Sequence, residues 1–478
     1  MKFNSIDFAV FLPIVFFLYW AMRNRRLGWQ NLLIVIASYV FYGWWDWRFV
    51  SLLIVSTLSD YGIGLALAGS SDERRRKMLL ISSLAINLGL LGFFKYFNFF
   101  IDSVSGAFTL FGREITTYSL NVILPVGISF YTFQTLSYTI DVYRRKIEPT
   151  RDFVAFAAYV SFFPQLVAGP IERAAHLLPQ FHQQRQFDYG LAKDGMRQIL
   201  WGLFKKVVIA DNCAVYANMI FDNSADYSGS TLWLGAFFFA FQIYGDFSGY
   251  SDIAIGVARL FGFDLMRNFA YPYFARDIAE FWRRWHISLT TWFRDYVYIP
   301  LGGSRVDISR QIRNVFIVFL VSGLWHGANW TFICWGAINA LYFLPLMLLK
   351  KNRNHLDVTA QGKWLPGWRE LMGIGVTFIL TLIAWVFFRA ENVPHAISYL
   401  GGMFSPSAVT MPEELPKKVL LLVACFLMVE WLGRDQQFAI QKLGLRWPRA
   451  VRWSLYYALI LMVFLLGGQE QEFIYFQF

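Results

Sequence analysis

Long apolar blocks recur from one end of this chain to the other, and they constrain its fold more than any other feature. The sequence is 56% hydrophobic and 16% charged, whereas soluble domains are about 45–50% apolar and about 25% charged. About 20 apolar residues let a helix cross a bilayer, so the blocks predict an all-α, polytopic membrane protein with roughly eleven transmembrane helices. The blocks are Phe8–Met22, Leu32–Trp45, Phe49–Ala68, Met78–Ile101, Leu120–Ile140, Ile199–Phe221, Leu232–Phe261, Asn314–Leu349, Gly373–Phe388, Val419–Leu432 and Leu455–Leu466.

Basic residues in the loops indicate which side of the membrane each loop faces. Arg23–Arg26, Arg74–Lys77 and Arg144–Lys146 follow the first, third and fifth blocks, and alternation of the spans puts them on one side. Positively charged loops remain in the cytosol, so we expect the amino terminus on the outer side. The net charge of +11 then fits an anionic inner leaflet and requires no nucleic acid.

No polar segment is long enough to build a separate soluble domain. The longest polar stretches are Glu172–Lys193, Lys350–Glu370 and Ala390–Lys418, each too short for an independent core. We therefore expect residues 1–478 to form one membrane domain. The three cysteines are widely separated within apolar blocks, which argues against a disulfide framework or a metal site.

The segment Tyr271–Gly303 has the pattern of a helix that lies in the membrane interface. Apolar and aromatic residues recur at i, i+3, i+4 and i+7 from Ile278 to Tyr296, which predicts one apolar helix face. Charged residues fall on the opposite face, and a helix divided in this way lies along the membrane surface. His286 is at the border between the faces, and Pro300 ends the predicted helix.

One histidine, His326, lies in the uncharged run Asn314–Leu349. Arginines precede this run and lysines follow it, so both ends should face the cytosol and the run should form a broken hairpin. Gly323–Gly327 is the expected break, because glycine weakens a helix. At about 1.5 Å per residue, His326 would lie about 18–20 Å deep, past the middle of the hydrocarbon core. An ionisable group at that depth is a candidate functional residue.

Several motifs together resemble the membrane-bound O-acyltransferase family. The longest is Phe281–Gly303 (FWRRWHISLTTWFRDYVYIPLGG), and Trp325–Gly327 follows it. The stretches Phe163–Arg173 and Tyr244–Asp252 and the terminal Phe473–Phe478 also match. Within the family, the closer likeness is to the subgroup of the alginate O-acetyltransferase membrane subunit.

The resemblance implies a fold in which spans and re-entrant helices surround a central funnel or tunnel. It also implies that His326 is the catalytic histidine and that His286 occupies the family's second polar position. The implied enzyme lies in the bacterial inner membrane and takes an acetyl group from cytosolic acetyl-CoA, a co-substrate. A periplasmic SGNH-type partner would pass the group to an exopolysaccharide or to peptidoglycan. The D-alanine-transferring subunit of teichoic acid modification is a more distant relative.

Acyl transfer to a hydroxyl group needs a base for the hydroxyl proton and donors that stabilise the oxyanion. An apolar environment keeps an imidazole neutral, so we assign the general base to His326. His286 would support it or contact the acyl donor; the alternative is an interfacial side chain that reaches water. Trp325 and Asn329 would shape the pocket around His326.

Two interpretations apply to the other polar residues near these motifs. Arg283, Arg284 and Arg294 would hold the phosphates of coenzyme A or would anchor the chain to lipid headgroups. Asp246 and Ser248 lie in an apolar run broken by glycines. There they would contact substrate, or the carboxylate would pair with a buried cation.

A transporter or channel is the alternative function, because broken helices and buried charges suit that class as well. Acylation of a lipid, a protein or teichoic acid is a further alternative within acyl transfer. The sequence has no G-x-S-x-G, Walker, H-E-x-x-H or paired C-x-x-C motif. These motifs are the signatures of serine hydrolases, nucleotide-binding sites and metal sites. Nothing in it indicates a metal or redox cofactor.

Overall fold

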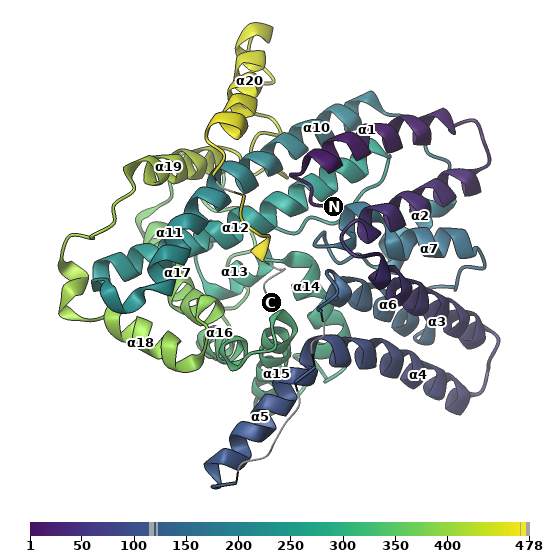
Figure 1. Ribbon diagram of the computed structural model, residues 1–478, viewed down its shortest axis with the longest axis horizontal. Helices are drawn as coiled ribbons and strands as arrows, with labels where there is room; N and C mark the ends of the chain where they lie inside the picture. The colour runs from purple at the N-terminus through teal and green to yellow at the C-terminus, as the bar shows by residue number, and fades with distance from the viewer. Residues whose placement is uncertain (114–118, 121–122, 469, 475–478) are drawn as a thin grey trace. The chain divides into compact units, whose positions relative to one another are not determined.

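The structure is a computed structural model of the chain, and it describes residues 1–113, 119–120, 123–468 and 470–474. Throughout these residues the regular secondary structure is helical, without a β-strand (Figure 1), which confirms the predicted all-α class. Residues 121 and 122 of the fifth apolar block and residues 475–478 of the terminal motif lie outside the described part.

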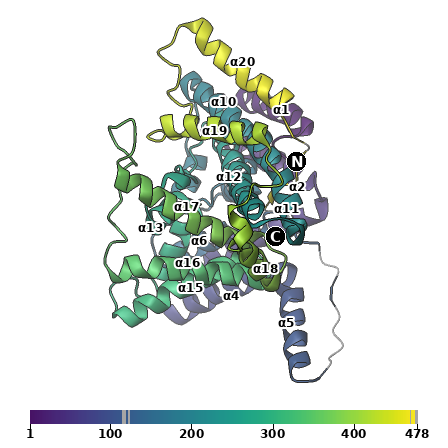
Figure 2. The same cartoon turned by 90° about the vertical axis from the view of Figure 1, so that its left-hand side faces the viewer.

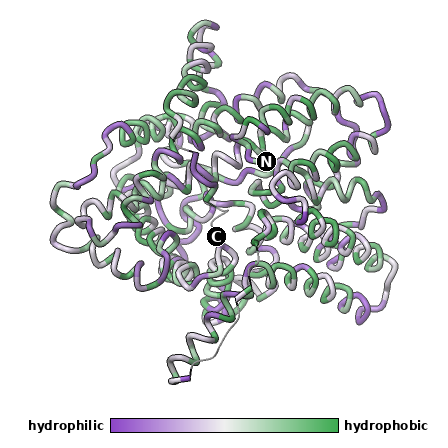
Figure 3. Tube along the Cα trace, viewed as in Figure 1, coloured by the Kyte–Doolittle hydropathy of each residue, from purple (hydrophilic) through white to green (hydrophobic). Residues whose placement is uncertain are grey.

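Several described helices are suited to a bilayer. By length and composition, four of them can cross a membrane: Trp47–Ala68, Glu73–Thr109, Trp330–Leu348 and Trp368–Arg389. Shorter apolar helices cover Ile6–Ala21 and Leu27–Gly43. Figure 3 shows apolar residues along the helices and polar residues in many of the connecting loops. The chain is therefore a membrane protein with several apolar helices, while the count of eleven and the central funnel stay predictions.

Contacts divide the chain into two compact units, the first of which joins Met1–Ala192 to Val257–Met266. In it, the buried carboxylate of Asp60 accepts hydrogen bonds from Ser83 and Asn87, which ties the third helix to the fourth. The main elements of this unit are α1 (Ile6–Ala21), α2 (Leu27–Gly43), α3 (Val50–Ala68), α4 (Glu73–Leu91), α5 (Phe97–Leu110), α6 (Ile128–Tyr143), α7 (Phe153–Ser161), α8 (Phe163–Leu166) and α9 (Ala174–Leu177).

The second unit joins Lys193–Gly256 to Arg267–Phe478 and contains both candidate histidines. Two helices, α10 and α12, have residues in both units. The expectation of a single domain over residues 1–478 stays a prediction. The main elements are α10 (Tyr189–Leu203), η4 (Phe204–Ala210), α11 (Asp211–Asp222), α12 (Gly229–Leu260), α13 (Ile278–Arg284), α14 (Ile287–Phe293), η7 (Arg294–Tyr298), α15 (Ile308–His326), α16 (Trp330–Leu348), α17 (Trp368–Arg389), α18 (Val393–Met403), α19 (Lys417–Leu432) and α20 (Arg449–Leu465).

The uncharged run around His326 forms a helical hairpin, as predicted. Helices α15 and α16 lie side by side in both views (Figures 1 and 2). The first helix ends at His326, and the side chain of Asn329 caps the second by accepting from the N–H of Thr331. Gly323 is a contact point of the hairpin rather than its break, because a Cβ there would overlap the backbone oxygen of Phe332.

The prediction of one continuous interfacial helix within Tyr271–Gly303 is wrong. Helix α13 ends at Arg284, and His286 adopts a left-handed backbone conformation with φ of 42° before α14 begins. The reason is a long-range pairing of the backbone: the N–H of Ile287 donates to the carbonyl of Asn268, and the N–H of Ala270 to that of Arg284. These bonds replace the helical bonds that a continuous helix would form at this point.

Candidate active site

The two candidate histidines lie together in the second unit. His326 closes α15, His286 lies at the break between α13 and α14, and their ring centroids are 6.4 Å apart. Both side chains are buried, with 3% and 1% of their surface exposed. Trp325 contacts both rings, at 5.9 Å from His286 and 5.0 Å from His326. The structure thus brings together three residues that the sequence places in two separate motifs.

Aromatic side chains surround the rings of both histidines. Trp335 of α16 and Phe388 of α17 lie 5.1 and 5.2 Å from the ring of His326, both edge-on. Phe247 of α12 contacts the ring of His286 edge-on at 4.6 Å. Burial lowers the pKa of His286 to about 3, because an apolar environment disfavours the charged imidazolium. His286 is therefore neutral at pH 7 and keeps one lone pair for a hydrogen bond or a proton.

Asn268 is a member of the site that the sequence analysis missed. It is fully buried, and its Oδ1 lies 3.0 Å from Nδ1 of His286. The residue stands in an irregular segment between α12 and α13 and in none of the motifs quoted above. Only the break at His286 brings the two residues together, and the sequence periodicity predicted no break there.

Asn329 lies beside the hairpin turn, where its side chain is used in backbone hydrogen bonds. Its Oδ1 caps α16, and its Nδ2 donates to the carbonyl of Glu391 at 2.8 Å. These bonds hold the start of α16 against the segment that follows α17. The predicted role of Asn329 in the pocket around His326 stays a prediction.

The three arginines predicted to bind the donor have different surroundings. Arg283 donates to the backbone carbonyls of Asn352 and His355 at 2.7 Å each. Arg284 is buried and pairs with Glu280 at 2.5 Å. Arg294 is exposed and pairs with its neighbour in sequence, Asp295. Arg283 and Arg284 therefore bind the loop after α16, and Arg284 also pairs with the buried Glu280. Of the three arginines, only Arg294 is exposed.

Two carboxylates of α12, the buried Asp246 and the largely buried Asp252, pair with adjacent lysines of η4. Lys206 lies 2.8 Å from Asp246, and Lys205 lies 2.6 Å from Asp252. This arrangement supports the interpretation that a carboxylate in this run pairs with a cation. The lysines themselves were missed, although two adjacent charges inside the block Ile199–Phe221 were a visible signal.

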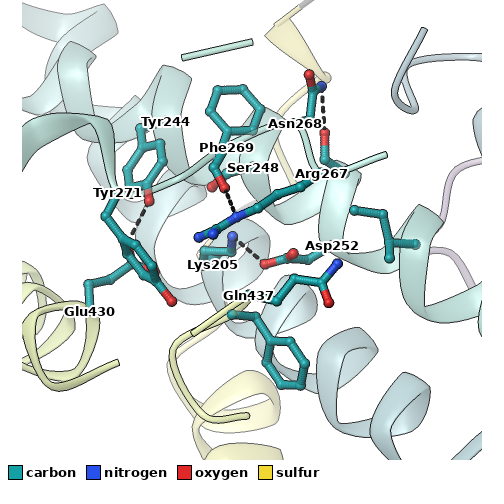
Figure 4. Close-up of a pocket in the computed structure, with 13 residues that line it drawn as sticks. Lys205, Tyr244, Ser248, Asp252, Arg267, Asn268, Phe269, Tyr271, Glu430 and Gln437 are labelled. Carbon is teal, nitrogen blue, oxygen red and sulfur yellow. Dashed lines mark hydrogen bonds and ion pairs between the residues drawn. The ribbon is translucent and has the colours of Figure 1, made fainter. Parts of the chain in front are cut away.

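The pair of Lys205 and Asp252 lines a small pocket, together with Ser248 and Asn268 (Figure 4). Across it, Tyr244 donates a 2.5 Å hydrogen bond to the buried carboxylate of Glu430 in α19. The Oγ of Ser248 is buried and has no hydrogen-bond partner within the described ranges. The cavity is small: the space open to the centre of a water molecule is about 10 Å³. That is roughly the room that one water molecule needs. The pocket is therefore a small polar cavity next to Asn268, the residue that hydrogen-bonds to His286.

The buried pair of His286 and His326, set among aromatic side chains in a chain of apolar helices, is the candidate active site of a membrane enzyme, and comparison with known proteins identifies its family. The membrane-bound O-acyltransferase family matches residues 40–384, a range that includes His286 and His326. The chain belongs to this family and is an O-acyltransferase, so the enzyme prediction is confirmed over the transporter alternative.

Particular relatives are similar over most or all of the chain. A protein named probable alginate O-acetylase AlgI from Pseudomonas putida is 40% identical over 100% of both chains. A peptidoglycan O-acetyltransferase from Helicobacter pylori is 35% identical over 86% of this chain and 81% of its own. A teichoic acid D-alanyltransferase from Streptococcus thermophilus is 27% identical over 55% of this chain and 68% of its own. The resemblance inferred from the motifs is therefore confirmed.

Proposed function

We propose that this protein moves an acetyl group from acetyl-CoA in the cytosol across the bacterial inner membrane for O-acetylation of an exopolysaccharide or of peptidoglycan. The observation that carries the proposal is the position of His326, a buried imidazole at a hairpin turn, among aromatic rings and beside His286. The relatives that act on alginate and on peptidoglycan match more of the chain than the teichoic acid relative does, which favours acetyl over D-alanyl transfer.

In the proposed reaction, His326 is the general base. It takes the proton of the acceptor hydroxyl while the hydroxyl oxygen attacks the thioester carbonyl carbon. The carbon–sulfur bond then breaks, and the imidazolium returns the proton to the thiolate, so an ester and a thiol are the products. A neutral imidazole in an apolar site suits this role because it begins without a proton on one nitrogen. A central funnel would let donor and acceptor reach His326 from opposite sides.

The remaining predicted residues have secondary places in this proposal. Arg294, exposed and outside the buried ion pairs, stays our candidate for the phosphates of the donor. Arg283 and Arg284 hold the loop that follows α16. Ser248 lines the pocket beside Asn268 and is our candidate for contact with the donor, whereas Asp246 acts through its pair with Lys206. We also propose a periplasmic SGNH-type partner as the next acetyl carrier and an amino terminus outside the cytosol.

The proposal is tested in a strain that lacks the gene and carries a plasmid copy. Ester-linked acetyl is measured by mass spectrometry in the exopolysaccharide and in the peptidoglycan. We expect His326→Ala to reduce the ester in one polymer by about 10²–10⁴-fold, the usual contribution of general acid–base catalysis. The matched control is His182→Ala, which changes an exposed histidine at the end of a short 3₁₀ helix and should restore the ester fully.

Two outcomes would contradict the proposal. If His326→Ala is present in the membrane in normal amount and still forms the ester at the normal level, His326 is not the general base. An unchanged acetyl content of both polymers in the deletion strain would remove the assigned acceptors.

A further inference from the structure

The side-chain amide of Asn268 is at the centre of a buried hydrogen-bond network. Its Nδ2 donates to Oγ of Ser251 in α12 at 3.1 Å. Its Oδ1 accepts from Oγ of Ser288 at 3.0 Å and from the backbone N–H of Ser288 at 3.4 Å. The same oxygen lies 3.0 Å from Nδ1 of His286. All four residues are buried, the amide of Asn268 completely.

The donors around the amide decide which of its atoms is the oxygen. The backbone N–H of Ser288 can only donate, so the amide atom that faces it must be an acceptor. A flipped amide would direct its NH₂ group at that N–H, so the hydrogen bond would become a contact between two donors. The orientation of Asn268 is therefore fixed by a neighbour whose hydrogen-bond role cannot change.

The fixed oxygen in turn decides where the proton of His286 lies. An oxygen accepts and does not donate, so Nδ1 of His286 must carry the hydrogen of the 3.0 Å bond. A neutral imidazole has one N–H, and its other nitrogen then carries the lone pair. His286 is consequently the Nδ1–H tautomer, with Nε2 as the basic nitrogen.

The backbone of Asn268 restrains the same histidine. Its carbonyl accepts from the N–H of Ile287 at 2.9 Å, directly after the left-handed residue His286. One residue thus holds both the main chain and the ring of His286, from a segment that precedes α13 and α14. Edge-on contact with Phe247 limits rotation of the ring.

We propose that Asn268 is a positioning residue that locks His286 in the Nδ1–H tautomer and so presents a lone pair on Nε2 in the centre of the site. Its effect on catalysis rests on the proposed acyl transfer, but the tautomer itself does not. Asn268 contacts no reacting atom in this proposal and acts only through His286.

The first experiment is nitrogen NMR of the full-length protein in lipid nanodiscs, labelled with ¹⁵N-histidine. His286→Asn identifies the signals of His286 by their loss. We expect the wild-type protein to show a protonated Nδ1 and an unprotonated Nε2 at neutral pH. A protonated Nε2 in the wild-type protein would overturn the proposal, whatever the enzyme's activity.

The second experiment compares substitutions at Asn268 by NMR and by steady-state kinetics of acetyl transfer. Asn268→Asp keeps an acceptor for Nδ1–H and should preserve the tautomer, whereas Asn268→Ala should populate both tautomers. We expect Asn268→Ala to lower kcat by about 10–100-fold, as loss of the partner that orients a functional histidine does at metal sites, with little change in KM. Asn268→Asp should recover most of that loss.

Asn314→Ala is the control for removal of a buried amide. Asn314 is fully buried near the start of α15, where it donates to the carbonyl of Leu301. Its replacement by alanine should leave the tautomer of His286 unchanged. An unchanged tautomer in Asn268→Ala would contradict the proposal. So would equal losses of kcat in Asn268→Ala and Asn268→Asp when both keep the wild-type melting temperature. Failure of the proposed function is a separate result: if His326→Ala keeps its activity, the general base is wrongly assigned, whatever the tautomer of His286.

Discussion

At the scale of single residues, the site depends on polar groups whose partners come from distant parts of the sequence. His286 bonds to Asn268, and Asp252 pairs with Lys205. Each group is costly to bury alone, and each is acceptable because a partner satisfies it. Asn268 and Lys205 lie outside the motifs quoted from the sequence, so sequence alone did not pair them with His286 and Asp252.

The ion pair of Lys205 and Asp252 gives a prediction at this scale. Removal of one partner of a buried pair leaves an uncompensated charge, which costs about 3–5 kcal/mol. We expect Lys205→Met to lower the melting temperature in detergent strongly, and the double variant Lys205→Met/Asp252→Asn to recover much of the loss. Differential scanning fluorimetry on the purified protein measures both. A double variant less stable than Lys205→Met would show that the pair is not the source of the effect.

At the scale of elements, the hairpin of α15 and α16 positions His326. Gly323 lets the two helices approach closely, because a Cβ there would overlap the backbone oxygen of Phe332. Backbone cannot move aside as a side chain can, so larger residues must push the helices apart. The position of His326, three residues later, depends on this contact.

Gly323→Ala is the prediction for this element. Overpacking of a tight contact costs about 1–3 kcal/mol, so we expect a lower melting temperature and a loss of acetyl transfer. Gly375→Ala is the matched control in α17, because a Cβ there meets no atom within 4 Å. It should be neutral or stabilise the helix by up to about 1 kcal/mol. Equal melting temperatures for the two variants would contradict the role of Gly323.

The elements also show what the sequence could and could not predict. The hairpin around His326 was predictable, because a long uncharged run with basic residues at both ends leaves few alternatives. The break at His286 was not, since it is made by backbone bonds to residues 268–270, and periodicity reports only the local pattern. Lys205 and Lys206 were visible as charges in an apolar block, but their pairing with Asp252 and Asp246 was not predictable, because those carboxylates lie on another helix.

At the scale of the whole molecule, the helices indicate a membrane protein, and its orientation is a prediction from the basic loops. The positive-inside rule places Arg25 in the cytosol and the cation-poor loop before α19 outside it. Both Arg25 and Met411 are exposed, so each position is suitable for labelling.

Cysteine labelling tests this topology. In a variant without the native cysteines, Arg25→Cys and Met411→Cys are treated on intact cells with a maleimide that does not cross the inner membrane. We expect Met411→Cys to react at once and Arg25→Cys to react only after the membrane is permeabilised. The reverse pattern would invert the orientation and would move the donor side of the enzyme to the periplasm.

The decisive measurement is the rate of acetyl transfer by purified protein with acetyl-CoA, the proposed SGNH-type partner and a polysaccharide acceptor, compared between wild type and His326→Ala. We expect His326→Ala to lower kcat by about 10²–10⁴-fold, while its melting temperature and its affinity for acetyl-CoA stay close to those of the wild type. An alanine variant that forms ester at the wild-type rate would contradict the assigned general base.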